Sequence, residues 1–233
     1  MFNQSISIVL PAYNEEENLR PLVEKCLEYL RANFKRFEIV IVDDGSRDMT
    51  AKIADEFADR NRHLVRVFHH HPNQGYGAAL RTGLLNSKAD LVFYTDSDNQ
   101  FDIYQINEFM PFVDSYDVLL GYRYPRKDPL YRLLVSGGYN LLASLVFKLK
   151  VKDINSSFKI FHRYVFNKIN IISDEFFVDA EIIAKARYNN FSILEMPVKH
   201  FPRGGGSTTV NLHHVFSTLK EMAAVFKELR FKK

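Results

Sequence analysis

The sequence predicts an α/β fold, with a mostly parallel central sheet flanked by helices. Short apolar runs rich in β-favouring residues alternate with segments of helical periodicity over the first half of the chain. Strands and helices at this spacing form βαβ units with parallel strands and right-handed crossovers. Polar clusters follow three of the apolar runs, at the position where ligands bind in such sheets. The 233 residues suffice for one large domain, or for a domain with an appendage.

The composition excludes several classes of protein. A net charge of +3 and an isoelectric point near 8.8 are too mild to indicate nucleic-acid binding. Cys26 is the single cysteine, which excludes a disulfide framework and a zinc site of several cysteines, and suits a reducing compartment. We expect no signal peptide, and no apolar stretch reaches the ~20 residues of a membrane span. A cytoplasmic protein, soluble or peripheral at a membrane, is therefore expected.

The first half of the chain predicts four strands, at residues 5–10, 37–42, 64–68 and from Leu91 to the carboxylate at Asp96. The first strand should end at Pro11, because proline cannot donate to a ladder, and Asn14 should cap the next helix. That helix has three glutamates in its first turn, where its dipole favours anions. Its apolar residues recur at helical spacing: Leu19, Leu22, Val23, Cys26, Leu27 and Leu30.

The second half predicts helices at residues 103–113, 133–149, 178–188 and 212–231, and strands at 117–121, 157–161 and 192–198. A glycine-rich loop precedes the last helix, which has one apolar face bordered by basic residues. We therefore divide the chain into a domain of residues 1–210 and an amphipathic C-terminal helix of residues 211–233. Such a helix can lie at a membrane interface or pack on the sheet, and the sequence leaves both open.

Two carboxylates and an amide end the strand that begins at Leu91. Asp96, Asp98 and Gln100 offer only oxygen ligands, which suits a hard cation such as Mg²⁺ or Mn²⁺. Such an ion usually keeps few protein ligands and takes the rest from water and substrate phosphates. A polar turn is the alternative, since these residue types favour turns. Carboxylates at the ends of other strands on the same edge favour a metal–diphosphate site.

Three other polar segments each have a functional and a structural interpretation. Asp43 and Asp44 follow the second strand and suit the base or ribose of a nucleotide, with a helix cap as the alternative. The Gly75–Gly77 segment lacks the third glycine of a dinucleotide fingerprint, so its small residues should instead let a helix approach the nucleotide or sheet closely. Three consecutive histidines begin at His69, but in an extended segment they cannot all face one ion, which argues against a metal cluster.

Basic residues in the second half are candidate phosphate ligands, because a guanidinium offers phosphate two parallel hydrogen bonds. They are Arg123, Arg132 and Arg203, together with Ser136. Arg132 and Ser136 are spaced i, i+4 and lie on one face of a helix. A solvated basic face is the alternative.

These motifs occur in the order seen in family 2 glycosyltransferases of the GT-A fold, and resemble in particular dolichol-phosphate mannose synthases and bacterial polyprenyl-phosphate glycosyltransferases. The resemblance covers nearly the whole chain. It rests on Pro11–Glu15, Asp43–Ser46, Asn73–Gly77, Asp96–Gln100, Gly121–Arg123 and Arg203–Ser207. The family's Thr-Ser-Gly-Phe-Arg segment is replaced by Asn155-Ser156-Ser157-Phe158-Lys159, so the resemblance does not identify the sugar.

The resemblance implies an inverting hexosyltransferase that moves a sugar from a nucleotide-diphosphate sugar to a polyprenyl (dolichyl or undecaprenyl) phosphate, with Mg²⁺ or Mn²⁺ as cofactor. It implies metal ligands at Asp96, Asp98 and Gln100, and acceptor-phosphate ligands at Arg123, Arg132 and Ser136. The implied nucleotide-binding residues are Pro11, Tyr13, Glu15, Asp43, Asp44, Gly75 and Asp96, and the implied catalytic residues are Asp98, Arg123 and Arg203.

The chemistry separates two kinds of acceptor. An acceptor phosphate is already anionic and needs little help from a general base, whereas a hydroxyl acceptor needs one, for which Asp179 and Glu181 are candidates. Two alternatives therefore stay open: transfer to a carbohydrate hydroxyl in polysaccharide synthesis, and a non-catalytic nucleotide-sugar-binding subunit of a membrane complex. Expected partners are the donor, the lipid acceptor and a membrane surface or membrane protein; a homo-oligomer stays open, and nucleic acid is not expected.

Overall fold

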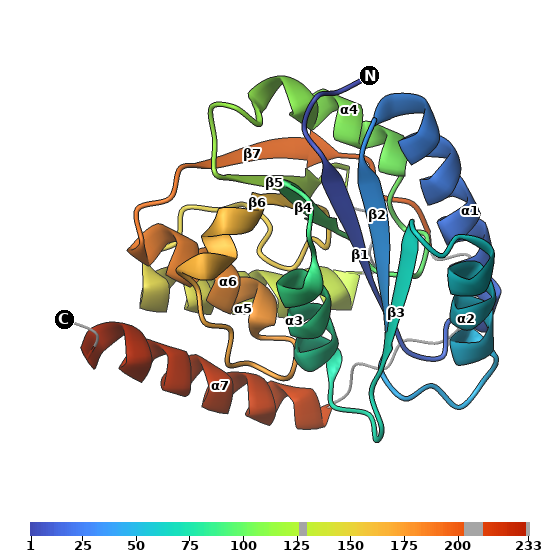
Figure 1. The fold of residues 1–233 in the computed structure, drawn as a ribbon. Coiled ribbons are helices and arrows are strands. Elements are labelled where there is room, and N and C mark those ends of the chain that lie inside the picture. The colour runs from blue at the N-terminus through green and yellow to red at the C-terminus, as the bar shows by residue number, and fades with distance from the viewer. Residues whose placement is uncertain (126–129, 203–211, 232–233) are drawn as a thin grey trace.

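A computed structural model describes residues 1–125, 130–202 and 212–231, with side chains except at 130–136 and 212–216. Its centre is a seven-stranded sheet in the order β3-β2-β1-β4-β6-β5-β7 (Figure 1). The strands are β1 (Ile6–Ala12), β2 (Phe37–Asp43), β3 (Val65–His69), β4 (Leu91–Tyr94), β5 (Val118–Arg123), β6 (Lys159–His162) and β7 (Ile193–Val198). β6 pairs antiparallel with β4 and β5, and every other pairing is parallel. The prediction of a mostly parallel α/β sheet is confirmed.

Helices cover both faces of the sheet (Figure 1). They are α1 (Glu16–Asn33), α2 (Thr50–Arg60), α3 (Tyr76–Asn86), α4 (Ile106–Phe109), α5 (Leu130–Phe147), α6 (Val178–Tyr188) and α7 (Leu212–Phe231), with short 3₁₀ turns at Ile103–Gln105, Met110–Phe112 and Arg163–Asn167. Side chains of β1 alternate between two cores. Ile8 and Leu10 pack with α1 and α2, whereas Val9 packs with α3. This alternation is expected of a strand that is covered on both faces.

The C-terminal helix packs on the second of these cores. Met222 and Val225 of α7 are buried in the cluster that also contains Ile182 and Ile183 of α6. In the part of the chain that the structure describes, none of the helices is long and apolar enough to cross a membrane.

Three local predictions were wrong. β1 continues through Pro11, because β4 ends at Tyr94 and the missing N–H of Pro11 falls beyond that pairing. Asn14 does not cap α1: it has a positive φ of 54° and accepts a hydrogen bond from the backbone N–H of Arg47 (2.8 Å). The helix expected at 103–113 is broken into short turns, since Pro111 cannot donate a helical hydrogen bond.

Candidate active site

Three segments meet at the carboxyl edge of the sheet, beyond the ends of β1, β2 and β4. The backbone N–H of Asp44 donates to the carbonyl of Ala12 (2.9 Å). The hydroxyl of Ser97 donates to the carbonyl of Pro11 (2.8 Å). Parallel strands place their carboxyl ends on one edge, so the carboxylates that follow them lie in one region, as expected. What they bind stays a prediction.

The segment after β1 is tied to the start of α2. The backbone N–H of Glu15 donates to the hydroxyl of Thr50 (2.8 Å), and the Asn18 amide donates to the Glu15 carboxylate (2.7 Å). Tyr13 is half-buried beside it. Of the predicted nucleotide-binding residues, Tyr13 and Glu15 thus lie in the loop that borders the segment after β2, whereas Pro11 lies within β1.

Asp43 and Asp44 are buried, and Asp44 holds the loop that follows β3. The Asp44 carboxylate accepts hydrogen bonds from the backbone N–H groups of Gln74 and Gly75, both at 2.9 Å. A carboxylate that accepts two backbone N–H bonds fixes the loop that donates them. Asp44 therefore has a structural role at the edge of the sheet, which is to hold the loop that contains Gln74 and Gly75.

The first two of the three consecutive histidines contact separate carboxylates, and the ring of His71 stacks on that of His69 with centroids 6.2 Å apart. His69 lies 3.0 Å from both Asp43 and Asp55, while His70 lies 2.7 Å from Asp44 and 2.9 Å from the hydroxyl of Thr82. Burial disfavours the charged form of His69, but its hydrogen bonds to Asp43 and Asp55 outweigh burial and raise its pKa. Their partners diverge, which agrees with the argument against a histidine metal cluster.

Asp96 is held through both of its carboxylate oxygens. The Tyr76 hydroxyl donates to Oδ1 (2.9 Å) and the Ser157 hydroxyl donates to Oδ2 (2.7 Å). Burial raises the pKa of Asp96, and these two hydrogen bonds act in the opposite direction. Tyr76 and Ser157 come from segments far from Asp96 in the sequence, and the sequence analysis did not single them out as site residues.

Asp98 and Gln100 continue this edge. The Asp98 carboxylate accepts the backbone N–H of Gln100 (3.1 Å), and the Gln100 side-chain amide donates to the carbonyl of Phe201 (3.1 Å). Within residues 1–125, 130–202 and 212–231, no three His, Cys, Asp or Glu side chains converge as a metal cage. The donor set of two carboxylates and an amide oxygen still fits Mg²⁺ or Mn²⁺, because these ions complete their coordination with water and substrate phosphates.

The predicted phosphate ligands are only partly described. Arg123 at the end of β5 forms a bidentate ion pair with buried Asp153, at 2.7 and 2.9 Å. A phosphate bound by Arg123 would therefore share the guanidinium with Asp153. Arg132 and Ser136 lie on α5, but their side chains fall outside the described residues, as does the whole of Arg203.

A buried ion pair lies behind Asp96. Lys159 of β6 is fully buried and donates to Asp179 of α6 (2.5 Å) and to the hydroxyl of Tyr94 (2.8 Å). The Tyr94 hydroxyl also donates to Asp179. Burial, reinforced by the charge of Asp179, raises the pKa of Tyr94 well above its ordinary value. A buried charge is costly unless it is paired, so the loss of either Lys159 or Asp179 would leave an unpaired charge at the end of β4 next to Asp96.

The two candidate bases of the hydroxyl-acceptor alternative are both engaged by protein groups. Asp179 pairs with Lys159, and Glu181 accepts the backbone N–H groups of Ile172 and Ser173, both at 2.8 Å. Glu181 also pairs with Lys185 (2.6 Å). These contacts give both carboxylates a structural role.

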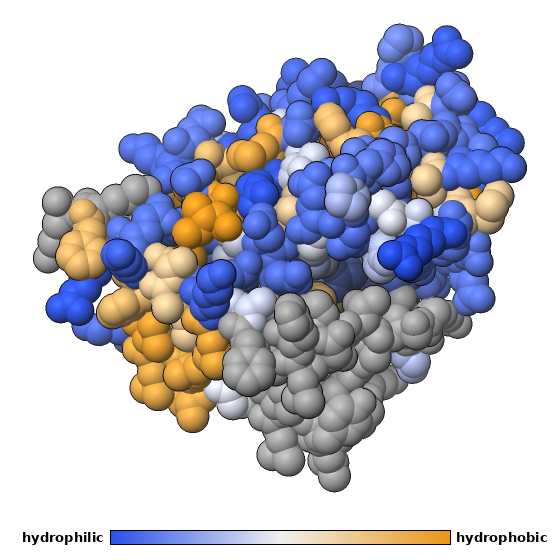
Figure 2. Space-filling model, turned by 90° about the horizontal axis from the view of Figure 1, so that it is seen from below, coloured by the Kyte–Doolittle hydropathy of each residue, from blue (hydrophilic) through white to orange (hydrophobic). Residues whose placement is uncertain are grey.

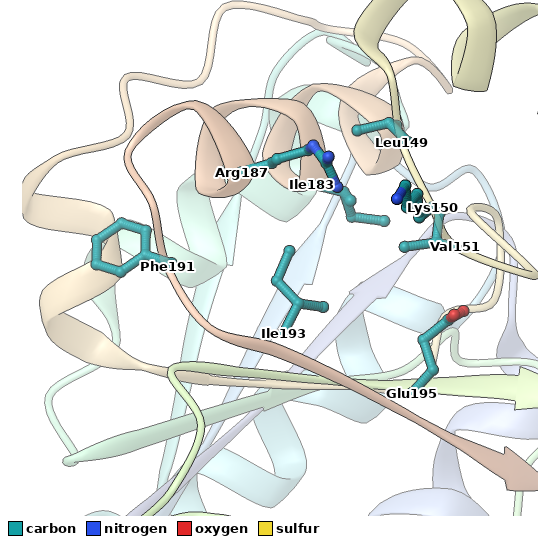
Figure 3. A pocket seen from close by; sticks show the side chains of 8 residues that line it. All are labelled: Leu149, Lys150, Val151, Ile183, Arg187, Phe191, Ile193 and Glu195. Atoms are coloured by element: carbon teal, nitrogen blue, oxygen red, sulfur yellow. The ribbon is translucent and has the colours of Figure 1, made fainter.

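A cavity of about 300 Å³ lies elsewhere, between the segment after α5, the C-terminal half of α6 and β7 (Figure 3). Apolar side chains line it together with Lys150, Arg187 and Glu195. None of the predicted site residues belongs to its lining, so the candidate active site is the carboxylate edge and not this cavity.

Comparison with known proteins places the chain in a protein family. Residues 7–169 match the model of the family described as "Glycosyl transferase family 2". The chain is 27% identical to the dodecaprenyl-phosphate galacturonate synthase of Rhizobium johnstonii, over 97% of this chain and 68% of the relative. It is 26% identical to the human dolichyl-phosphate beta-glucosyltransferase, over 84% of this chain and 67% of the relative.

The chain spans only part of each of these relatives, and a smaller part of others. It is 31% identical to the undecaprenyl-phosphate 4-deoxy-4-formamido-L-arabinose transferase of Pectobacterium atrosepticum over 70% of this chain, but over only half of that protein. Among solved structures, glucosyl-3-phosphoglycerate synthase from Mycobacterium tuberculosis, in complex with Mn²⁺, UDP and phosphoglyceric acid, has a TM-score of 0.73 at 18% identity. That match covers 97% of this chain and 78% of the other, and it establishes the GT-A fold.

Proposed function

The chain belongs to glycosyl transferase family 2, and on that premise we propose that it transfers a sugar, with inversion, from a nucleotide-diphosphate sugar to a polyprenyl phosphate. The observation that carries the proposal is the pair Asp96 and Asp98 at the carboxyl end of β4, beside the carboxylates that end β2. The names of the relatives support the acceptor, since three of them act on dodecaprenyl, dolichyl or undecaprenyl phosphate.

In the donor half of the proposed site, Asp96, Asp98 and Gln100 would hold Mg²⁺ or Mn²⁺. The ion supplies a Lewis acid for the negative charge that develops on the leaving diphosphate. The loop of Tyr13 and Glu15, hydrogen-bonded to α2, and the buried Asp43 and Asp44 would border the nucleoside. Gly75, whose N–H is bound by Asp44, would complete that border.

In the acceptor half, Arg123, Arg132, Ser136 and Arg203 would bind the lipid phosphate and the diphosphate. A phosphate is anionic at neutral pH, so it attacks the sugar without a strong general base. The engagement of Asp179 and Glu181 by buried cations and backbone N–H groups supports this choice over a hydroxyl acceptor. Asp153 would orient Arg123 through its bidentate contact.

We further propose that the enzyme is peripheral at a membrane, where a polyprenyl phosphate resides. The helix that carries Arg132 and Ser136 exposes Leu141, Leu142 and Leu145, which are 62%, 41% and 69% exposed. Figure 2 shows apolar side chains gathered in one region of the molecule's lower face. The division into residues 1–210 and an amphipathic helix of residues 211–233 belongs to the same proposal, with α7 contributing exposed Leu219 and Phe226.

A transfer assay tests this function. Purified protein is incubated with radiolabelled nucleotide sugars, a short-chain polyprenyl phosphate and Mn²⁺, and the organic phase is counted. We expect labelled lipid with the wild type, and a loss of roughly 10²-fold or more with Asp98→Asn, because one electrostatic contact to the developing charge is removed. Label that stays in an aqueous polysaccharide would instead support a hydroxyl acceptor, and no product with any common nucleotide sugar would refute the proposal.

A further inference from the structure

The segment Gln74–Tyr76 bridges two carboxylates of the proposed donor site. The N–H groups of Gln74 and Gly75 donate to Asp44, at the end of β2, and the hydroxyl of Tyr76 donates to Asp96, at the end of β4. Three consecutive residues thus connect the end of β2, which would border the nucleoside, with the end of β4, which would border the diphosphate. A shift of Tyr76 relative to Asp44 would displace the Asp96 carboxylate.

The glycines on either side of Tyr76 leave no room for a side chain. Gly75 has a φ of 98°, and a Cβ there would lie 2.4 Å from the carbonyl oxygen of Asp174. A Cβ on Gly77 would lie 2.6 Å from the carbonyl oxygen of Glu175. Tyr76 is therefore flanked by glycines that pack directly on the 173–175 segment.

Two further contacts hold the Tyr76 ring and its target. The ring stacks on Phe176, with centroids 5.5 Å apart and an interplanar angle of 17°. On its other oxygen, Asp96 accepts the hydroxyl of Ser157, which is 3% exposed. Both oxygens of Asp96 are thereby fixed by hydroxyl donors from different segments, which restricts rotation of the carboxylate.

We propose that Tyr76 and Ser157 are positioning residues for Asp96, holding its carboxylate in the orientation that receives a metal–nucleoside diphosphate. This inference rests on the proposed function, because it takes the carboxylate edge to be the donor site. It assigns a task to two residues that neither touch the reacting atoms nor belong to the acidic motif. A carboxylate that is already held in the binding orientation gives higher affinity than a mobile one, because no conformational entropy is lost when the donor binds.

The test uses Tyr76→Phe, which removes only the hydroxyl and keeps the ring on Phe176. Binding of UDP, GDP and dTDP, each with Mn²⁺, is measured by calorimetry without an acceptor, so turnover plays no part. For the nucleotide that the wild type binds most tightly, we expect roughly tenfold weaker binding in Tyr76→Phe, the usual scale for losing a hydrogen bond to a charged group. In a transfer assay the donor KM should rise by a similar factor, with a smaller change in kcat.

Matched variants separate positioning from general damage. Tyr104→Phe removes a hydroxyl that donates to Glu28 on the exposed face of α1 (3.3 Å), and should leave the affinity unchanged. Ser157→Ala should weaken nucleotide binding, and Ser157→Thr, which keeps the hydroxyl, should restore most of it. Thermal unfolding of each variant shows whether the fold is kept.

The outcomes distinguish this inference from the function on which it rests. Equal or tighter binding by a folded Tyr76→Phe overturns the positioning role alone. A wild type that binds none of the nucleoside diphosphates overturns both. Intact nucleotide binding that weakens in Tyr76→Phe, together with no transfer to a polyprenyl phosphate, supports the positioning role and overturns the proposed acceptor.

Discussion

At the scale of single residues, glycines set the geometry of the donor edge. Gly75 and Gly77 let the start of α3 lie against the backbone of residues 173–175, while Gly83 lies against Val9 of β1. The sequence analysis expected small residues here to allow a close approach to the nucleotide or sheet. Gly75 and Gly77 approach the segment before α6, while Ala79 packs with Val9 of β1 and Gly83 lies against the same strand, so α3 does approach the sheet. The approach to a nucleotide stays a prediction.

Replacing Gly75 tests that account of the backbone. Gly75→Ala places a Cβ 2.4 Å from a carbonyl oxygen at a φ of 98°, so something must shift. We expect the free energy of unfolding to fall by about 2 kcal/mol or more, from strain at a glycine-only conformation and the steric clash. Urea denaturation measures this change.

Gly137→Ala in α5 is the matched control, because a Cβ there meets nothing within 4 Å. Alanine also lowers the conformational entropy of the unfolded chain, so this variant should be neutral or more stable by about 0.5–1 kcal/mol. If Gly75→Ala were as stable as Gly137→Ala, the account of Gly75 would be wrong.

The acidic residues could be located from the sequence, whereas their partners could not. Asp96 and Asp98 are visible because carboxylates directly follow an apolar run. Tyr76 and Ser157 reach Asp96 across separations of 20 and 61 residues, which no local pattern encodes. Ser157 and Lys159 occupy two of the three positions where the chain departs from the Thr-Ser-Gly-Phe-Arg segment, and that departure was the one available signal.

At the scale of elements, α5 joins the proposed acceptor site to the apolar surface. Its first half carries Arg132 and Ser136, and its second half exposes three leucines. Residues 141 and 145 are spaced i, i+4 and lie on one face, while Ala143 is buried beneath the helix. A helix with this distribution suits the boundary between a protein and a lipid surface.

Removing two of these leucines tests the membrane contact. For the double variant Leu141→Ser and Leu145→Ser, we expect affinity for anionic phospholipid vesicles to fall roughly 30-fold, at about 1 kcal/mol for each partly inserted side chain. Co-sedimentation with vesicles measures the change, and nucleotide binding should be unaffected because the leucines lie outside the carboxylate edge.

Leu85→Ser is the control, since Leu85 is 56% exposed on α3 and not on α5. It should leave vesicle binding unchanged. Vesicle binding by the double variant that equals that of the wild type would show that α5 does not contact the membrane.

Most elements follow from hydrophobic periodicity, since apart from the helix expected at 103–113 the apolar runs and helical faces in the sequence became strands and helices within a few residues. Strand direction does not follow from it. β6 is antiparallel to both β4 and β5. These pairings join segments that are distant in the sequence, so no local pattern predicts them. The broken helix around Pro111 was also missed, since its apolar spacing continues through the proline.

At the scale of the whole molecule, two layers of helices cover the faces of the sheet, and the candidate active site lies at the carboxyl edge of its strands. Buried ion pairs stabilise the layer on the side of α6: Lys159 pairs with Asp179, and Lys185 pairs with Glu181 and with Glu228 of α7, both at 2.6 Å. The last contact joins the C-terminal helix to the layer that lies behind Asp96. This arrangement is compatible with the proposed donor site at the carboxylate edge and with the proposed membrane contact of α5.

The central claim is that this chain transfers a sugar to a lipid phosphate. The most direct measurement compares a short-chain polyprenyl phosphate with the corresponding polyprenol, under the same labelled donor and Mn²⁺. We predict labelled lipid from the phosphate and none from the alcohol, because the acceptor's own charge replaces a general base. Equal transfer to the alcohol, or product from neither lipid while a carbohydrate acceptor is labelled, would contradict the account.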